Sequence, residues 1–182
     1  QSLPGDMMIV GAGDYAATTD GGDWTEHGIA GILADGSMYL LDWWRGQVGP
    51  EVWIEKQVDM IIKHKPVAWF GETGPLRRAT EGRLKQRMIE RRAPCRLEWL
   101  PTIGDKATRA QSLIAVAGMG RLWWARAAWT GELQRQCLVF PAGSPDDGVD
   151  TLGLLGRGAD TLGRKSKPIN KADMMPTGRM AM

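Results

Sequence analysis

The chain has 182 residues, of which 43% are hydrophobic, and this is enough for one domain with a buried core. Its formal net charge of +2 does not by itself indicate a nucleic-acid partner. The two cysteines, Cys95 and Cys137, form no CxxC pair, which argues against a disulfide framework or a zinc site. We see no secretory signal and no apolar run long enough to cross a membrane, so we expect an intracellular protein without a membrane contact.

Residues 7–16, MMIVGAGDYA, combine an apolar run with the glycine spacing of a dinucleotide-binding fingerprint. That fingerprint requires a helix directly after the glycines, because the helix N-terminus holds the pyrophosphate. Residues 16–28 show no helical spacing and are predicted to be a loop. We therefore interpret Gly11 and Gly13 as positions where the backbone approaches something closely beside Asp14, at the end of the first strand.

The following segments give one predicted element after another. Residues 29–33 and 38–44 flank an Asp-Gly turn and predict a hairpin. A helix is predicted over 50–65, starting at a proline and stopped by Pro66. The remaining predictions are a strand over 67–70, a basic helix over 76–92, a strand over 95–100, a loop and helix over 102–117, a short strand over 122–124, a helix over 129–139, and a final helix over 146–156.

The order β-β-β-α-β-α-β-α predicts an α/β protein with a ribonuclease H-like fold. Its mixed central sheet would combine an antiparallel three-strand meander with parallel strands, flanked by helices. We expect residues 1–160 to form the domain and 161–182 a flexible, basic C-terminal tail. Residues 158–166, GADTLGRKS, are one residue away from a P-loop, but no apolar strand leads into them, so a nucleotide site is not predicted.

Acidic residues follow two of the predicted strands and open the last helix. In an open sheet Asp14 and Glu72 would lie side by side, and Asp147 and Asp150 would share one helix face. Helix capping is the alternative for Asp146 or Asp147. Clustered carboxylates repel unless a cation neutralises them, and oxygen ligands favour Mg²⁺ or Mn²⁺. Two such ions about 4 Å apart can support phosphodiester hydrolysis.

The segment 76–92 carries seven basic residues against Glu81 and Glu90. It could face phosphates, with Arg77 and Arg78 as DNA contacts, or be an ordinary solvated helix face, and the sequence leaves both interpretations open. His27 and His64 are expected to be ordinary core or surface residues.

Five segments in order resemble the C-terminal nuclease domain of the large terminase subunit of tailed bacteriophages: DYAATTDGGDWT, MYLLDWWRGQ, KPVAWFGETG, GDKATRAQS and FPAGSPDDGVDTLG. The resemblance covers residues 8–158. It implies a two-metal endonuclease that uses Mg²⁺ or Mn²⁺ and cuts concatemeric viral DNA during genome packaging in the host cytoplasm. It also implies double-stranded DNA, a terminase ATPase domain, the small terminase subunit and the portal protein as partners.

The resemblance assigns Asp14, Glu72 and Asp147 as catalytic residues. It places the metal ligands at Asp14, Glu72 and the Asp146–Asp147 pair, with Asp150 as the helical neighbour. Lys106 and Arg109 match the family's DKxxRA segment, where they would meet phosphate or order the site. Pro145 replaces a frequent histidine of the family, and Thr151 stands where a small residue is usual.

Three hypotheses remain on these grounds. The leading one is a metal-dependent DNA endonuclease without ATPase activity, since no P-loop is found. The second is a junction-resolving or recombination nuclease of the same fold. The third is a non-catalytic module that docks on portal or DNA.

Overall fold

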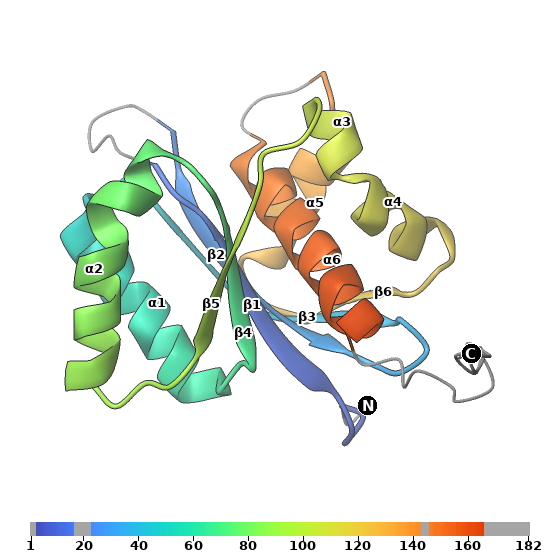
Figure 1. Ribbon diagram of the computed structural model, residues 1–182. Helices are drawn as coiled ribbons and strands as arrows, with labels where there is room; N and C mark the ends of the chain where they lie inside the picture. The colour runs from blue at the N-terminus through green and yellow to red at the C-terminus, as the bar shows by residue number, and fades with distance from the viewer. Residues whose placement is uncertain (1–2, 17–22, 143–145, 166–182) are drawn as a thin grey trace, which may run out of the picture.

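A computed structural model describes residues 3–16, 23–142 and 146–165. These residues form a six-stranded sheet with the strand order β5-β4-β1-β2-β3-β6 (Figure 1). The first three strands are an antiparallel meander: β1 (Met8–Asp14), β2 (Thr25–Ile32) and β3 (Met38–Gly46). The parallel neighbours are β4 (Ala68–Glu72) beside β1, β5 (Arg96–Leu100) beside β4, and β6 (Leu122–Trp124) beside β3. The predicted α/β, ribonuclease H-like architecture is confirmed.

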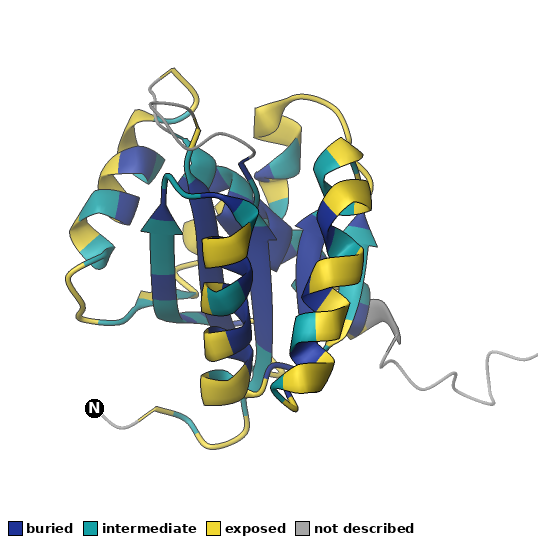
Figure 2. Cartoon of the chain, turned by 90° about the vertical axis from the view of Figure 1, so that its left-hand side faces the viewer, coloured by how far each residue is buried: buried dark blue, intermediate teal, exposed yellow. Residues whose placement is uncertain are grey.

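Helices cover both faces of this sheet (Figure 1). One face carries α1 (Pro50–His64) and α2 (Pro75–Glu90). The other carries α3 (Lys106–Arg109), α4 (Gln111–Gly118), α5 (Thr130–Val139) and α6 (Asp147–Lys165). Figure 2 shows the strands buried behind α1 and α2, whose outward sides are exposed. The molecule is therefore a three-layer sandwich with one apolar core on each side of the sheet.

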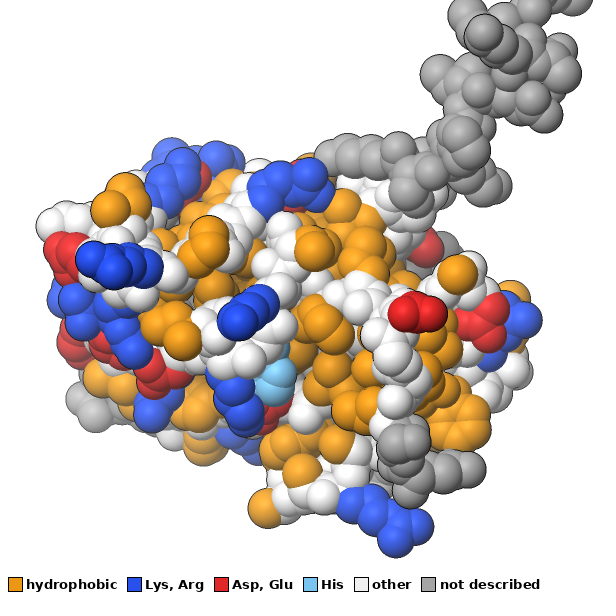
Figure 3. Space-filling view, turned by 90° about the horizontal axis from the view of Figure 1, so that it is seen from below, with side chains coloured by type: hydrophobic (Ala, Val, Ile, Leu, Met, Phe, Trp, Pro, Cys, Tyr) orange, Lys and Arg blue, Asp and Glu red, His pale blue; other side chains and the backbone are white. Residues whose placement is uncertain are grey.

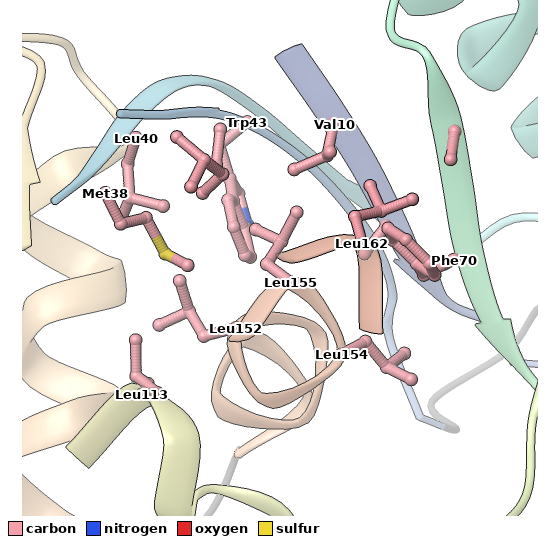
Figure 4. Close-up of a cluster of buried hydrophobic side chains, with 14 of the residues drawn as sticks. Val10, Met38, Leu40, Trp43, Phe70, Leu113, Leu152, Leu154, Leu155 and Leu162 are labelled. Atoms are coloured by element: carbon pink, nitrogen blue, oxygen red, sulfur yellow. The ribbon is translucent and has the colours of Figure 1, made fainter. Parts of the chain in front are cut away.

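The core under α6 fixes this helix across the middle of the sheet. Leu152 and Leu155 have no exposure to solvent, and they pack with side chains from β1, β3 and β4 (Figure 4). Burying a leucine side chain stabilises the folded state by about 1.5–3 kcal/mol. The N-terminus of α6 is thereby held beside the ends of β1 and β4.

The prediction of a loop over residues 16–28 is wrong for its last part, since β2 begins at Thr25. Thr25, Glu26 and His27 are completely buried, and each side chain has hydrogen-bonding partners. A strand that buries satisfied polar groups shows no hydrophobic alternation, so the sequence pattern concealed it. Residues 17–22 lie outside the described residues.

The close approach expected at Gly11 and Gly13 is to aromatic side chains. A Cβ atom at Gly11 would lie 2.3 Å from the ring of Trp69, and one at Gly13 would lie 2.7 Å from the ring of His27. Because a side chain at either position would clash with these rings, the glycines are needed for packing between β1 and the layer of α1 and α2.

The final helix is longer than predicted and ends at Lys165. Residues 158–165 of the P-loop-like segment are therefore helical. The helix also includes the first five residues assigned to the tail, and residues 166–182 lie outside the described residues. Within the described part of the chain, no helix has the length and apolarity needed to span a membrane.

The two ends of the sheet differ in character. Seen from below, apolar side chains reach the surface between charged groups (Figure 3). The large apolar residues exposed on the molecule include Leu3 and Val67, which precede β1 and β4, and Ile89 near the end of α2. The carboxylates described next lie at the opposite end, where β1 and β4 terminate.

Candidate active site

Asp14 and Glu72 end two adjacent parallel strands. Val10 pairs with Ala68 and Ala12 with Phe70, and Asp14 and Glu72 each follow the last of these pairs by two residues. Val10, Ala12, Ala68 and Phe70 all belong to the core under α6. Because side chains alternate along a strand, Asp14 and Glu72 project to this same side. The predicted juxtaposition of the two carboxylates is thus found, and α6 begins next to it.

The acidic residues of α6 complete the cluster. Burial, followed by the negative charges of Asp150, Asp147 and Glu72, raises the pKa of Asp14 from 3.8 to about 7, against a hydrogen bond from the backbone of Tyr15. Burial also raises the pKa of Asp147, and the charges of Asp23 and Asp146 add to this. The charges of Glu72 on β4 and of Asp147 and Asp150 on α6 therefore all act on Asp14 of β1.

Three cationic side chains bind the rim of this cluster. The Lys106 ammonium lies 2.7 Å from Asp146. Arg109 lies 3.0 Å from Asp150 and 3.7 Å from Glu72. Lys106 and Arg109, predicted as residues that meet phosphate or order the site, thus contact carboxylates in this structure.

The third cation, Arg157, was missed by the sequence analysis. Its guanidinium lies 3.3 Å from Glu72 and donates a hydrogen bond of 2.5 Å to the carbonyl oxygen of Pro101. A signal was present in the sequence, because Arg157 follows Asp150 by seven residues, two helical turns along the same face.

Asp146 differs from the other four acidic residues. Both of its carboxylate oxygens accept hydrogen bonds from Lys106 at 2.7 Å. Its backbone carbonyl accepts from the amides of Val149 and Asp150, at the start of α6. Asp146 therefore stabilises the start of α6, whereas the charges of Asp147 and Asp150 raise the pKa of Asp14.

Thr151 ties α6 to the two central strands. Its hydroxyl accepts a hydrogen bond from the backbone amide of Asp14 and donates one to the backbone carbonyl of Glu26, each at 3.3 Å. Thr151 has no exposure to solvent. This contact explains why a threonine, and not a smaller residue, suits the position beside Asp150.

Glu26 is a second residue that the sequence analysis missed. It is the register partner of Asp14 on β2 and has no exposure to solvent. Its carboxylate accepts hydrogen bonds from Trp43 at 2.5 Å and Gln136 at 3.3 Å, and lies 3.4 Å from Arg45. Burial raises its pKa, while the Trp43 hydrogen bond and Arg45 lower it. A period of two from Ala30 would have placed Glu26 on the inner face of a longer strand.

Four of the seven basic residues of the α2 segment form ion pairs with glutamate side chains. Arg77 and Lys85 pair with Glu81, and Arg87 and Arg91 pair with Glu55 on α1. These contacts match the solvated-face interpretation. The described residues provide no ion pair for the exposed Arg78, which follows Glu72 by six residues. Arg77 also lies 5.2 Å above the ring of Trp99.

Neither histidine contacts the acidic cluster of Asp14, Glu72, Asp147 and Asp150. His27 is buried on the side of α1, with its ring nitrogens 3.2 and 3.1 Å from the carbonyl oxygens of Glu26 and Trp53. His64 lies 2.6 Å from Asp42.

The donor set suits a hard divalent cation. It consists of carboxylate oxygens alone. Burial first, and then repulsion from the neighbouring carboxylates, raises the pKa of Asp14, and a bound cation would relieve that repulsion. Across residues 3–16, 23–142 and 146–165, no three His, Cys, Asp or Glu side chains are arranged to hold one ion. Glu72 and Asp150 are instead bound by guanidinium groups.

The strand order and the helices on both faces of the sheet define a ribonuclease H-like fold. Comparison with solved structures bears this out. The large terminase nuclease of thermophilic phage G20c, with bound zinc, superposes with a TM-score of 0.60 at 11% identity, over 82% of this chain and 80% of that one. The large terminase of thermophilic bacteriophage D6E, in complex with ADP, gives 0.58 at 12% identity over 85% of this chain. The chain spans 40% of that protein.

Junction resolvases share the fold as well. The Fowlpox virus resolvase, in complex with Holliday junction DNA, gives a TM-score of 0.52 at 9% identity, over 85% of this chain and 99% of that one. No family model matches the sequence, and no curated protein matches it. The resemblance to terminase nuclease domains is thus confirmed at the level of the fold.

Proposed function

We propose that the chain is a metal-dependent DNA endonuclease, with Asp14, Glu72 and Asp147 as catalytic residues and Asp150 as a further metal ligand. The observation that carries this proposal is the meeting of four carboxylates from β1, β4 and α6 at one end of the sheet. Mg²⁺ or Mn²⁺ bound there would activate a water molecule and stabilise the leaving oxygen of a phosphodiester.

The chain's own residues have definable tasks in this proposal. Glu72 and the acidic residues of α6 all act on Asp14, so its carboxylate would be the central ligand of the bound cations. Arg109 and Arg157 neutralise Glu72 and Asp150 in the metal-free protein and become available to phosphate when cations take over this task. Arg77 and Arg78, at the start of α2, would extend the phosphate contacts beyond the site.

The biological role follows the terminase resemblance. We propose cutting of concatemeric viral DNA during genome packaging in the host cytoplasm, together with an ATPase domain, a small subunit and a portal protein. The likeness in fold to terminase nucleases supports this role. We assign no ATPase activity to these residues, since 158–165 are helical and not a phosphate-binding loop.

A junction-resolving nuclease is the second candidate, and the likeness in fold to the Fowlpox virus resolvase favours it. The test is cleavage of linear duplex, plasmid and four-way-junction DNA with Mg²⁺, Mn²⁺ or EDTA. Cutting of linear and plasmid DNA with either ion supports the packaging nuclease, and cutting confined to junctions supports a resolvase. Binding of DNA without cutting under any condition would favour the docking module, and undiminished cutting in EDTA would contradict the metal-dependent mechanism.

A further inference from the structure

A buried polar network lies directly behind the first turn of α6. Gln136 on α5 uses both ends of its side-chain amide: its nitrogen donates to Glu26, and its oxygen accepts from the backbone amide of Gly148 at 3.0 Å. Gln136 is 1% exposed, so neither bond is exchanged for water. Gly148 stands between Asp147 and Asp150, and the network therefore reaches the helix turn that carries both carboxylates.

Glu26 sets the direction of this amide. A carboxylate accepts hydrogen bonds and donates none, so only the nitrogen end of Gln136 can face it. The oxygen end is then left for the helix N-terminus, whose first amides have no partner within the helix. The Gly148 amide, which can only donate, and Glu132, 3.5 Å from the Gln136 nitrogen, favour the same orientation, and Glu26 supplies the buried acceptor that holds the nitrogen end.

The strands are shaped to hold Glu26 in place. The register between β2 and β3 shifts between Ile29 and Ala30, so that beyond the shift Trp43 and Arg45 face the side of α6. Trp43 donates to one Glu26 oxygen, and Arg45 lies beside the other. Residues of the sheet thus fix the position of the Glu26 carboxylate. Gln136 connects this carboxylate to the first turn of α6.

The contact with α6 is close. A Cβ atom at Gly148 would lie 2.7 Å from the Gln136 oxygen, 3.0 Å from a Glu26 oxygen and 2.5 Å from Leu133. The glycine therefore lets the first turn of the helix sit directly on the network.

We propose that Glu26 is a positioning residue, which holds Asp147 and Asp150 in register with Asp14 through Gln136 and the amide of Gly148. This inference rests on the proposed metal-dependent function. Glu26 does not touch the metal or DNA in this scheme. It acts as the outer support that orients metal-binding carboxylates, and loss of such partners commonly weakens metal binding by about 10- to 100-fold.

Two variants test the proposal. Glu26→Gln keeps the size of the side chain but places a donor where three donors already converge. Gln136→Met removes the link to Gly148 and leaves the Glu26–Arg45 and Glu26–Trp43 contacts intact. It therefore still tests the proposal if Glu26→Gln does not fold. Ile61→Ala removes apolar packing under α1, on the opposite face of the sheet, and serves as the destabilised control.

Two readouts apply to all five proteins, namely the parent, the two network variants, their double variant and Ile61→Ala: hydrogen exchange of the Gly148 amide in EDTA, and calorimetric titration with Mn²⁺ alone. We expect both network variants to exchange this amide at least about tenfold faster and to bind Mn²⁺ about 10- to 100-fold more weakly. The double variant should lose no more Gly148 protection and no more Mn²⁺ affinity than the single variant with the larger loss. Ile61→Ala should match the parent in both readouts.

Unchanged protection of Gly148, or faster exchange with unchanged Mn²⁺ affinity, would overturn the proposal. The same holds if Ile61→Ala loses as much affinity as the network variants. Failure of the proposed function would be seen elsewhere, in a parent protein that neither binds Mn²⁺ nor cuts DNA.

Discussion

The guanidinium of Arg157 lies 3.3 Å from the carboxylate of Glu72, although 85 residues separate them in the chain. Arg109 approaches the same carboxylate at 3.7 Å. These two cations offset the repulsion of the acidic cluster when no metal is bound. A divalent ion at Glu72 would perform the same electrostatic task.

Arg157→Gln should therefore lower stability in a metal-dependent way. Both side chains of the pair are partly shielded, at 12% and 28% exposure, so we expect a loss of about 1–2 kcal/mol in the free energy of unfolding in EDTA. In saturating Mn²⁺ the loss should shrink, because the ion neutralises Glu72 instead. Urea unfolding under both conditions measures this, and an equal loss with and without Mn²⁺ would contradict it.

Asp14→Asn should abolish cutting while keeping the fold. The variant loses the charge that holds the cations, so activity should fall by several orders of magnitude. The folded-state pKa of Asp14, about 7, lies above its ordinary value of 3.8, so ionised Asp14 costs stability fully above pH 7, and this cost disappears as the pH falls from 7 towards 4. In EDTA the variant should thus melt higher than the parent at pH 8, with a smaller difference at pH 4.

Plasmid cleavage and thermal melts provide the measurements for Asp14→Asn. The control is Asp23→Asn, an exposed residue whose charge acts on Asp147 and which should cost far less activity. If Asp14→Asn cuts as well as the parent, or if only the Asp23 variant is inactive, the metal site has been assigned to the wrong aspartate.

Thr151→Val and Thr151→Ser form a matched pair. Valine keeps the shape but removes the hydroxyl that accepts from the partly buried backbone amide of Asp14, which should cost about 1–3 kcal/mol. Serine retains the hydroxyl and should cost less. Urea unfolding measures the stability of both variants. If the valine variant is as stable as the serine variant, the hydroxyl hydrogen bonds of Thr151 do not stabilise the fold.

Arg78→Ala should weaken DNA binding and reduce the slope of log affinity against log salt by about 1. Arg78 is exposed and has no ion pair within the described residues, so phosphate can recruit it without breaking a contact. Arg91→Ala is the control, because Arg91 is bound to Asp59 at 2.6 Å and to Glu55. Fluorescence anisotropy at several salt concentrations measures the slopes. Equal slopes for both variants and the parent would mean that α2 is a solvated helix face and does not contact DNA.

His27 should remain neutral down to acidic pH. Burial lowers its pKa from 6.5 to about 4, so the folded state resists protonation. Above pH 6.5 the histidine is neutral in both the folded and the unfolded state, so it costs no stability. As the pH falls from 6.5 to about 4, only the unfolded state takes up the proton, and the free energy of unfolding falls by about 3 kcal/mol in total. NMR of the ring protons, assigned with a His64→Asn variant, measures the titration, and a His27 midpoint near 6.5 would contradict the burial.

The sequence predicted the juxtaposition of Asp14 and Glu72 at the candidate site, but it did not predict the residues that surround them. Strand ends marked Asp14 and Glu72, because a carboxylate after an apolar run is visible in one dimension. Glu26 and Thr25 were hidden because they are polar residues whose burial depends on partners far along the chain. Arg157 and Gln136 act through contacts across 85 and 110 residues, and no local pattern records such distances.

The placement of α6 at the far end of the described chain has a consequence for synthesis on the ribosome. Asp14 is synthesised more than 130 residues before Asp147 and Asp150, which lie on the helix that also covers the apolar side of β1, β2 and β4. A nascent or prematurely terminated chain that lacks α6 therefore has half of its acidic cluster and an open core. The acidic cluster is therefore complete only once α6 has been made and has packed on the sheet. Under the proposed function we expect no DNA cleavage from a chain that ends before α6.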